Sequence, residues 1–349
     1  MFDHFAPPPL APANPLARLV DVTMRDGGFE VDFHWPEVLF PRIPTVLAPF
    51  GVEIVELGYL GGVPLEHAVT TPGVGAHLTP DHVAAAHHPD VQLAAMVHPT
   101  ALLAPIDLKE YAAAGLAMIR LVYHPGWFDD IANIARHAKD NGLVVSVNLA
   151  LASRYERGEL VNHASRVAAA IAPNVLYVAD TCGALTPDQV TQLVTALMVE
   201  IGVDIGFHAH DFLSLGYANA LAAAAAGATY LDCSLLGLGR GGGNLPAELV
   251  LIRHRLPGRH VAAALDGLLA CRDSLAALTR RPATSLVAAV CGALNLTPIE
   301  EQALLEFAQG EHLDPSWAAL WLATAAGRVP SLRAADLAQT LRAEAAVLK

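Results

Sequence analysis

The sequence lacks the features of a membrane, exported or nucleic-acid-binding protein. No stretch approaches the ~18 uncharged apolar residues of a membrane span, although 54% of the 349 residues are hydrophobic. The proline-rich residues 1–15 have neither the basic nor the apolar part of a secretory signal. Lysine and arginine form no run, and the formal net charge is −13, which argues against polyanionic partners. We therefore expect a cytoplasmic protein with no nucleic-acid or membrane partner.

Cysteine is scarce as well. The chain has only four cysteines, which stand far apart and form no C-x-x-C pair. This usage is typical of neither a disulfide framework nor a zinc knuckle. We expect the four side chains to be reduced, buried thiols, as suits the cytoplasm.

Short apolar runs alternating with helical Ala/Leu-rich segments fill the first two thirds of the chain. Near-continuous apolar strands predict parallel pairing with both faces covered, and eight such units favour a closed (β/α)8 TIM barrel. An open doubly wound sheet is the alternative, but the G-x-G-x-x-G pattern expected after its first strand is missing. The predicted strands are 19–24, 52–57, 91–97, 118–123, 143–149, 175–179, 204–207 and 229–235. The predicted helices between them are 36–50, 79–87, 108–114, 128–141, 162–172, 187–201 and 215–226.

The strand pattern ends near residue 255, and helical stretches separated by proline-containing turns follow. We expect an N-terminal extension over residues 1–18, a barrel over 19–260 and a helical subdomain over 261–349. The helical subdomain has few convergent polar residues, so we expect it to pack against the barrel or another copy of the chain. Its apolar helices indicate a homo-oligomer.

Polar residues gather where the predicted strands end, which is where (β/α)8 barrels place their active sites. His208 and His210 share one face at the end of the seventh strand, and barrel closure brings that end near Asp26 after the first. Two imidazoles and a carboxylate leave about three positions open on a six-coordinate ion. The set predicts a divalent metal, Mn²⁺ or Mg²⁺, with Zn²⁺, Co²⁺ or Fe²⁺ as alternatives.

An arginine and a glycine-rich segment accompany these three residues. Arg25 either pairs with a carboxylate such as Glu56 or stabilises an oxyanion beside the metal, and a paired arginine can do both. Residues 237–248 contain so much glycine that the backbone can approach a ligand, and Asn244 there would coordinate the metal or hold the loop. Phosphate binding is the alternative for this segment, because many barrels bind phosphate at that place.

These motifs together resemble the DRE-TIM metallolyase superfamily, and they occur in its order between about residues 19 and 250. The resemblance implies that Asp26, His208 and His210 bind a divalent metal, with Asn244 at or near it. It also implies that Arg25 stabilises an enolate and that Glu56 orients Arg25. The matching segments are VDVTMRDGG (20–28), VELG (55–58), DTCG (180–183), HAHD (208–211) and the glycine-rich residues 237–248.

Within that superfamily the chain is most similar to the 4-hydroxy-2-oxoacid aldolases, through GLGRGGGN at 237–244, LSLG at 213–216 and His124. The similarity implies a carbon–carbon lyase that acts through the enolate of a 2-oxo acid such as pyruvate, with an aldehyde or related acceptor. Two departures stand out. Phe29 occupies the place of a histidine base in those aldolases, and no tyrosine follows Tyr230.

The group that transfers the proton therefore has to be sought elsewhere. His34, Tyr59, His98 and His124 are the candidates around the predicted barrel mouth. A neutral imidazole with a pKa of about 6.5 suits this task at neutral pH. We favour His124 because of its place at the end of the fourth predicted strand.

Two other functions compete with the lyase. A Claisen-type synthase would join an acyl-CoA to a 2-oxo acid, but residues 256–349 are short for the regulatory or lid region of such enzymes. A non-catalytic scaffold would have no need of the metal site, whereas all three predicted ligands and the arginine are present.

Overall fold

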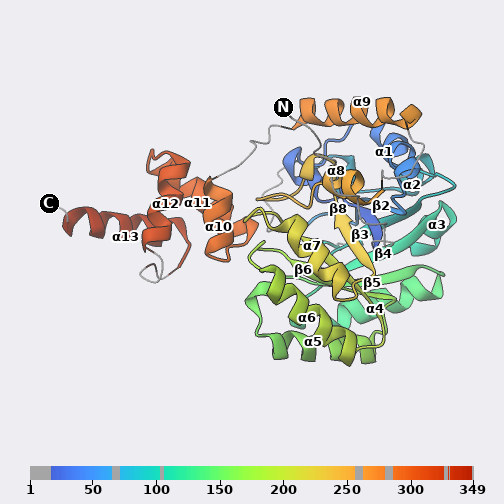
Figure 1. Ribbon diagram of the computed structural model, residues 1–349, viewed down its shortest axis with the longest axis horizontal. Coiled ribbons are helices and arrows are strands. Elements are labelled where there is room, and N and C mark those ends of the chain that lie inside the picture. Colours follow the sequence, from blue (N-terminus) through green and yellow to red (C-terminus); the bar gives the residue numbers. More distant parts are fainter. Residues whose placement is uncertain are drawn as a thin grey trace, which may run out of the picture.

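Eight parallel strands pair in chain order and close into a barrel, in which the last strand pairs with the first. The computed structural model (Figure 1) describes residues 17–64, 71–102, 106–255, 262–279, 286–325, 329 and 331–347. The predicted TIM barrel is confirmed, and the predicted N-terminal extension lies almost wholly outside the described residues. The strands are β1 (Arg18–Asp21), β2 (Ile54–Leu60), β3 (Gln92–Val97), β4 (Leu116–Tyr123), β5 (Val144–Leu149), β6 (Val175–Asp180), β7 (Asp204–Ala209) and β8 (Tyr230–Cys233).

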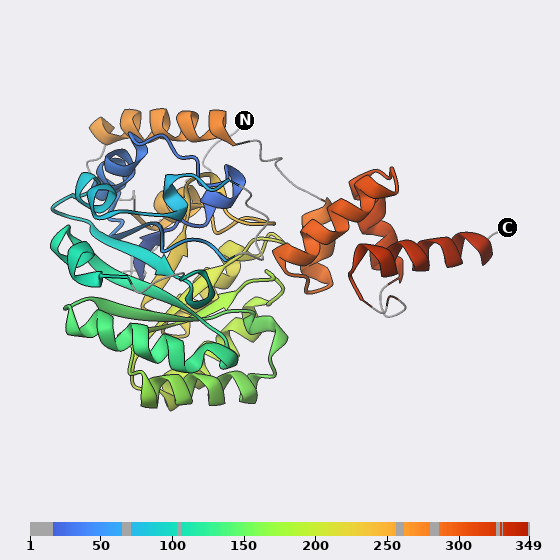
Figure 2. The same ribbon diagram turned by 180° about the vertical axis from the view of Figure 1, so that it is seen from behind.

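Helices connect the strands and cover the outside of the barrel (Figures 1 and 2). Local signals define where several of them begin: α6 starts at Pro187, after a capping box in which Thr186 and Gln189 bond each other's backbone. Each predicted connecting helix is present, although α5 begins at Arg157 rather than at residue 162. The helices are α1 (Leu39–Leu47), α2 (Pro80–Ala85), α3 (Leu108–Ala113), α4 (Phe128–Asp140), α5 (Arg157–Ala170), α6 (Pro187–Glu200), α7 (Gly216–Ala225) and α8 (Ala247–Val250).

The interior of the barrel changes from apolar to charged along its axis. Near the amino ends of the strands it is filled by an apolar cluster that includes Ile54, Met118 and Tyr230. Side chains two residues further along a strand point the same way and lie nearer the mouth. In these three strands they are charged and buried, namely Glu56, Arg120 and Asp232. The apolar layers thus form a base on which a polar site is built.

The helices after the barrel form two separate parts. Helix α9 (Ala262–Leu278) packs against α1 on the outside of the barrel (Figure 1). We therefore propose that the border with the helical unit lies after α9 rather than at residue 260. The next four helices share their own hydrophobic cluster, to which the barrel contributes Phe212. They are α10 (Leu286–Ala293), α11 (Pro298–Gly310), α12 (Pro315–Ala325) and α13 (Ala334–Val347), and they extend from one side of the barrel (Figure 2).

The four cysteines are buried and free, as predicted. Within the described segments, none of the helices combines the length and the apolar character that crossing a membrane requires. The homo-oligomer and the cytoplasmic location remain predictions.

Candidate active site

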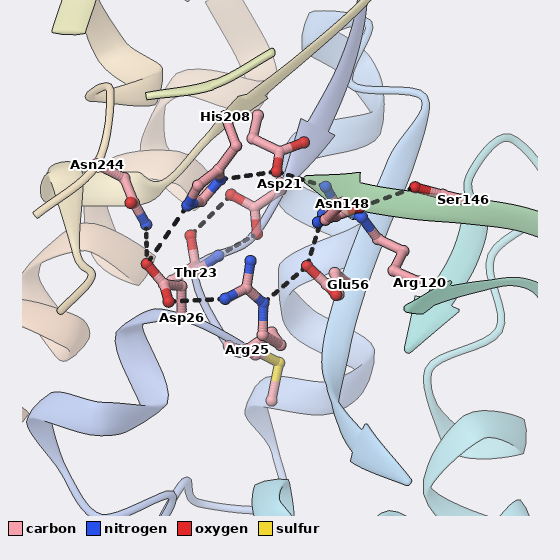
Figure 3. Close-up of polar contacts among 12 residues, drawn as sticks. Asp21, Thr23, Arg25, Asp26, Glu56, Arg120, Ser146, Asn148, His208 and Asn244 are labelled. Carbon is pink, nitrogen blue, oxygen red and sulfur yellow. Dashed lines mark hydrogen bonds and ion pairs between the residues drawn. The ribbon is translucent and has the colours of Figure 1, made fainter. Parts of the chain in front are cut away.

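Asp26, His208 and His210 meet at the mouth of the barrel, as their strand-end positions predict. The Nε2 atoms of the two histidines lie 3.3 Å apart, and each lies 3.9 Å from Asp26 Oδ2. Figure 3 shows His208 and Asp26 facing each other. Donor atoms of all three residues lie within 4.8 Å of one another, and each residue is at most 5% exposed. Among the described residues, no other group of histidine, cysteine and acidic side chains converges in this way.

The protonation states of this group suit a divalent cation. Burial lowers the pKa of His210 to about 3, so that its imidazole is neutral at neutral pH. Burial raises the pKa of Asp26, but Arg25 and the two imidazoles outweigh it and hold this pKa below its usual range. Imidazole nitrogens and an ionised carboxylate are the donors that a hard or borderline divalent ion binds. The residues present therefore fit such a metal.

The glycine-rich segment after β8 packs directly onto Asp26. Asn244 Nδ2 donates to Asp26 Oδ2 at 2.8 Å and to the Leu238 carbonyl at 2.9 Å. A Cβ atom at Gly239 would lie 2.4 Å from Asn244 Nδ2 and 2.8 Å from Asp26 Oδ2, so this close approach requires glycine. Asn244 thus holds the loop against the carboxylate. Its buried Oδ1 has no hydrogen-bond partner among the described residues, which leaves that oxygen available to a ligand.

Arg25 lies between two carboxylates (Figure 3). Its Nη1 donates to Asp26 Oδ1 at 2.7 Å and its Nε donates to Glu56 Oε2 at 2.9 Å. Burial lowers the pKa of Arg25, but the charges of Glu56 and Asp26 raise it by more than burial lowers it. The net pKa is above its usual value, so the guanidinium keeps its charge. The ion pair predicted for Arg25 and Glu56 is therefore present. Glu56, however, lies inside the barrel and not at a strand end, because β2 continues to Leu60.

Two charged residues that sequence reasoning missed extend this pairing across the barrel. Arg120 Nη1 donates to Glu56 Oε2 at 2.7 Å, and its Nη2 donates to Asp232 Oδ2 at 2.6 Å. The same Asp232 oxygen accepts a hydrogen bond from His208 Nδ1 at 2.8 Å. Arg25, Asp26, Glu56, Arg120 and Asp232 form what we call the charged network. The sequence offered one sign of Arg120 and Asp232: each is the single charged residue in a predicted strand that is otherwise mostly apolar.

A cavity of about 200 Å³ opens above the metal-ligand group and contains three of the four candidates for proton transfer. Tyr59 and His98 line it from buried positions, and His124 lines it from an exposed one. His34 is not among its lining residues, and its Nε2 bonds the Thr71 carbonyl at 2.7 Å. The structure thus separates His34 from the other three.

The three candidates differ in their surroundings. Burial lowers the pKa of His98 to about 4, and its Nδ1 lies 2.8 Å from Thr100 Oγ1. Burial raises the pKa of Tyr59 to about 12, which keeps the phenol protonated at neutral pH. His124 Nδ1 accepts a hydrogen bond from the Gly126 amide at 3.1 Å, so a neutral His124 ring carries its proton on Nε2.

The helical unit contributes to the cavity as well, which sequence reasoning missed. Thr297, Pro298 and Ile299, at the start of α11, line one side of it. A capping box between Thr297 and Glu300 begins this helix, and Glu300 also pairs with Arg154 of the barrel. The sequence Thr-Pro-x-Glu at 297–300 predicts that a helix starts there, but it does not predict which part of the molecule this helix contacts.

Residues 17–274 match the sequence model of the HMGL-like family. The chain belongs to this family. The match covers the whole barrel and most of α9, and it confirms the resemblance to the metal-dependent DRE-TIM lyases.

Individual relatives agree with this assignment. A 4-hydroxy-2-oxovalerate aldolase of Nocardia farcinica is 31% identical over 263 residues, which are 74% of either chain. A 4-hydroxy-2-oxovalerate aldolase of Rhodococcus opacus is 34% identical over 242 residues, or 68% of either chain. An oxaloacetate decarboxylase of Mycobacterium tuberculosis is 30% identical over 250 residues, or 71% of this chain and 73% of that relative.

Solved structures share the fold. The N-terminal domain of a proposed aldolase from Bacteroides vulgatus superposes with a TM-score of 0.69 at 22% identity, covering 84% of this chain and 98% of that one. The carboxyl transferase domain of Rhizobium etli pyruvate carboxylase has a TM-score of 0.63 at 17% identity, covering 86% of this chain and 54% of that one.

Proposed function

We propose that this protein is a divalent-metal-dependent lyase that forms or cleaves a carbon–carbon bond through the enolate of a 2-oxo acid such as pyruvate. The observation that carries the proposal is the meeting of Asp26, His208 and His210 at one point, with the Arg25 guanidinium 2.7 Å from the same Asp26. Relatives named 4-hydroxy-2-oxovalerate aldolase and oxaloacetate decarboxylase support it, because both names describe cleavage of a 2-oxo acid.

Asp26, His208 and His210 would hold the metal, and Asn244 would lie beside it with its Oδ1 available as a further ligand. The mixture of imidazole and oxygen donors favours Mn²⁺ or Mg²⁺ in our proposal, with Zn²⁺ or Co²⁺ as alternatives. When bound there, such an ion would polarise the 2-oxo group of the substrate as a Lewis acid.

Arg25 would stabilise the negative charge that develops on the substrate oxygen as the enolate forms. It lines the cavity, and its two ion pairs hold the guanidinium in one orientation. A fixed positive charge in a buried site stabilises an oxyanion more than a mobile one, because it needs no reorganisation when the charge appears. Glu56 would act as the positioning residue for Arg25.

His124 is our proposal for the group that takes up the substrate proton and returns it. It lines the cavity at the end of β4. To accept a proton on Nδ1 the ring would first have to give up its hydrogen bond from the Gly126 amide. His98, which is neutral and more buried, is the alternative.

Deuterium exchange at the methyl group of pyruvate tests the proposal, because it reports enolate formation without an acceptor. We expect metal-dependent exchange in the wild-type protein. Asp26→Asn, His208→Ala and His210→Ala should each lose bound metal and exchange but keep the fold, because these side chains lie above the packed layers of the barrel. His137→Ala, on the exposed side of α4, is the control.

Full metal content in all three ligand variants would refute the assignment. Exchange or turnover that requires an acyl-CoA would favour the Claisen-type synthase instead. A protein that binds no metal and exchanges no proton would be a scaffold.

A further inference from the structure

Tyr59 lines the cavity with a hydroxyl that the proposed chemistry at the metal does not use. Its residue is 4% exposed, and it shares the cavity with Arg25 and the three proposed metal ligands. Among the residues that the structure describes, none forms a hydrogen bond with the phenolic oxygen. A buried donor without a partner destabilises a folded protein, so an unpaired donor beside a cavity is typical of a place where a ligand binds.

A β-bulge in β2 turns Tyr59 toward the interior of the barrel. Glu56 pairs with Ala94 of β3. Tyr59 pairs with Met96, so three steps along β2 match two steps along β3. In a regular strand successive side chains alternate between the two faces, and Tyr59 would then point away from the face that carries Glu56. The extra residue reverses this and places Tyr59 on the inward face, opposite Met96, which also lines the cavity.

The bulge depends on a glycine. Gly58 has a φ of +152°, a backbone conformation that residues with a side chain rarely adopt. A Cβ atom at this position would lie 2.1 Å from the carbonyl oxygen of Gly75, which belongs to the backbone and cannot turn aside. Bulges of this kind are frequent beside active sites, where they change the direction of a side chain. The direction of Tyr59 is therefore built into the strand.

Aromatic neighbours fix the phenol ring in this direction. The Tyr59 ring packs edge-to-face on Phe33 and Phe29, with ring centres 5.6 and 6.2 Å away. Phe33 is itself fully buried, and the two phenylalanine rings pack on each other at 4.8 Å. Because the ring is held by two neighbours, its hydroxyl needs little further ordering to bind a ligand.

The phenol is a neutral donor on the Arg25 side of the cavity. Strand β2 pairs with β1, and the segment after β1 carries Arg25. Burial is the largest cause of the raised pKa of Tyr59, which is about 12, and the charge of Arg25 is the next largest influence and lowers it. Even at its ordinary pKa of about 10 a phenol is protonated at neutral pH. Tyr59 can therefore donate a hydrogen bond close to the guanidinium.

Cleavage of a 4-hydroxy-2-oxo acid places negative charge on two oxygens in turn. The 4-hydroxyl first gives its proton to the base, which is His124 in our proposal. The C3–C4 bond then breaks, the 4-oxygen becomes the carbonyl oxygen of an aldehyde, and the electron pair of the bond forms the enolate, with its charge on the 2-oxygen. The proton returns to C3 to give the shorter 2-oxo acid. Arg25 would serve the 2-oxygen, so the 4-oxygen needs a donor of its own.

We propose that Tyr59 is a catalytic residue whose hydroxyl donates a hydrogen bond to the 4-oxygen of the substrate as that oxygen loses its proton. This role rests on the proposed function above, because it requires a 4-hydroxy-2-oxo acid as substrate. Tyr59 keeps its own proton throughout and adds no proton-transfer step. Pyruvate has no 4-oxygen, so Tyr59 takes no part in forming the enolate of pyruvate.

Two reactions of the full-length, Mn²⁺-loaded protein separate these roles. Cleavage of 4-hydroxy-2-oxopentanoate involves the 4-oxygen, whereas deuterium exchange at the methyl group of pyruvate does not. Tyr59→Phe should lower kcat for cleavage about 100-fold, the usual effect of removing one donor to a developing oxyanion. Its KM should change little, because the hydrogen bond strengthens only in the transition state. Its rate of deuterium exchange should stay at the wild-type level.

Tyr123→Phe is the matched control. Tyr123 also lines the cavity, but its hydroxyl lies 3.0 Å from His163 Nδ1 of α5 and is paired there. This variant should cleave and exchange at the wild-type rates. Tyr59→Phe removes an oxygen that no described residue bonds, so its urea unfolding curve should show no loss of stability. A loss of stability would show that the Tyr59 hydroxyl has a structural partner and would overturn the inference.

The ratio of variant to wild-type rates decides the role of Tyr59. Wild-type cleavage in Tyr59→Phe would overturn the inference, and so would equal losses of cleavage and exchange, which would place Tyr59 at the 2-oxo end of the substrate. A wild type that exchanges the protons of pyruvate but does not cleave the 4-hydroxy acid would also overturn it, with the enolate chemistry left standing. Failure of the wild type in both reactions would instead overturn the proposed function.

Discussion

Asp232 Oδ2 lies 2.8 Å from His208 Nδ1, and this contact determines which nitrogen of His208 faces Asp26. Because the carboxylate only accepts hydrogen bonds, Nδ1 is the donor in this contact, and in the neutral ring this leaves the lone pair on Nε2, 3.9 Å from Asp26 Oδ2. The same Asp232 oxygen accepts a hydrogen bond from Arg120. The buried Asp232 on β8 thereby orients His208, a proposed metal ligand on β7.

Asp232→Asn should weaken metal binding by about 10–100-fold, the usual effect of removing the partner that orients a ligating histidine. Calorimetric titration with Mn²⁺ measures this without relying on turnover. Asp21→Asn is the control, because Asp21 is equally buried at the end of β1 but accepts hydrogen bonds from the amide and the hydroxyl of Thr23. An unchanged affinity in Asp232→Asn would limit that residue to a structural role.

Arg25→Lys should keep the metal and lose at least about 100-fold in the rate of deuterium exchange. Lysine keeps the charge, but its single ammonium group cannot bond Asp26 and Glu56 from the two sides of a planar fork. Metal content and exchange rate are measured on the same samples. A nearly wild-type rate would show that Arg25 serves only as an ion-pair partner.

Arg120→Met should lower the free energy of unfolding by about 3–5 kcal/mol, because it leaves Glu56 and Asp232 buried without their shared cation. Urea unfolding at neutral pH measures the effect. Arg272→Met provides the comparison: Arg272 pairs with Glu248 but its side chain is 34% exposed, and such pairs contribute about 0–1 kcal/mol. Equal losses in the two variants would contradict the importance of burial.

His124→Ala should reduce deuterium exchange into pyruvate sharply while metal content stays at the wild-type level. The reason is that no other group would accept the proton with the same access to the cavity. His98→Ala is measured in parallel. If exchange survives in His124→Ala and is lost in His98→Ala, the buried histidine is the base.

The pKa of His98 should rise in Arg240→Gln. Burial and, after it, the positive charge of Arg240 together lower this pKa to about 4, so removing the charge makes protonation easier. NMR titration of the imidazole signals of wild type and variant measures the shift, with His137 on the outside of α4 as reference. An unchanged His98 titration would mean that the guanidinium does not face the cavity.

The sequence by itself determined the barrel and the convergence of its strand ends. Strand and helix patterns depend on residues close to one another in the chain, so each of the eight predicted strands overlaps an observed one. Once eight parallel strands close, the end of β7 must lie near the end of β1. The meeting of Asp26, His208 and His210 follows from that closure alone, without knowledge of any contact.

Only the tertiary structure decided which distant side chains pair. Arg120 pairs with Glu56, which is 64 residues away in the chain, and with Asp232, which is 112 residues away. No sequence pattern near these strands predicts either partner. The same is true of Arg240 on Phe29, and of Ile299, which reaches the cavity from a helix outside the barrel. Such pairings depend on strand register and on how α11 docks, which are set by the packing of the whole molecule and not by local propensity.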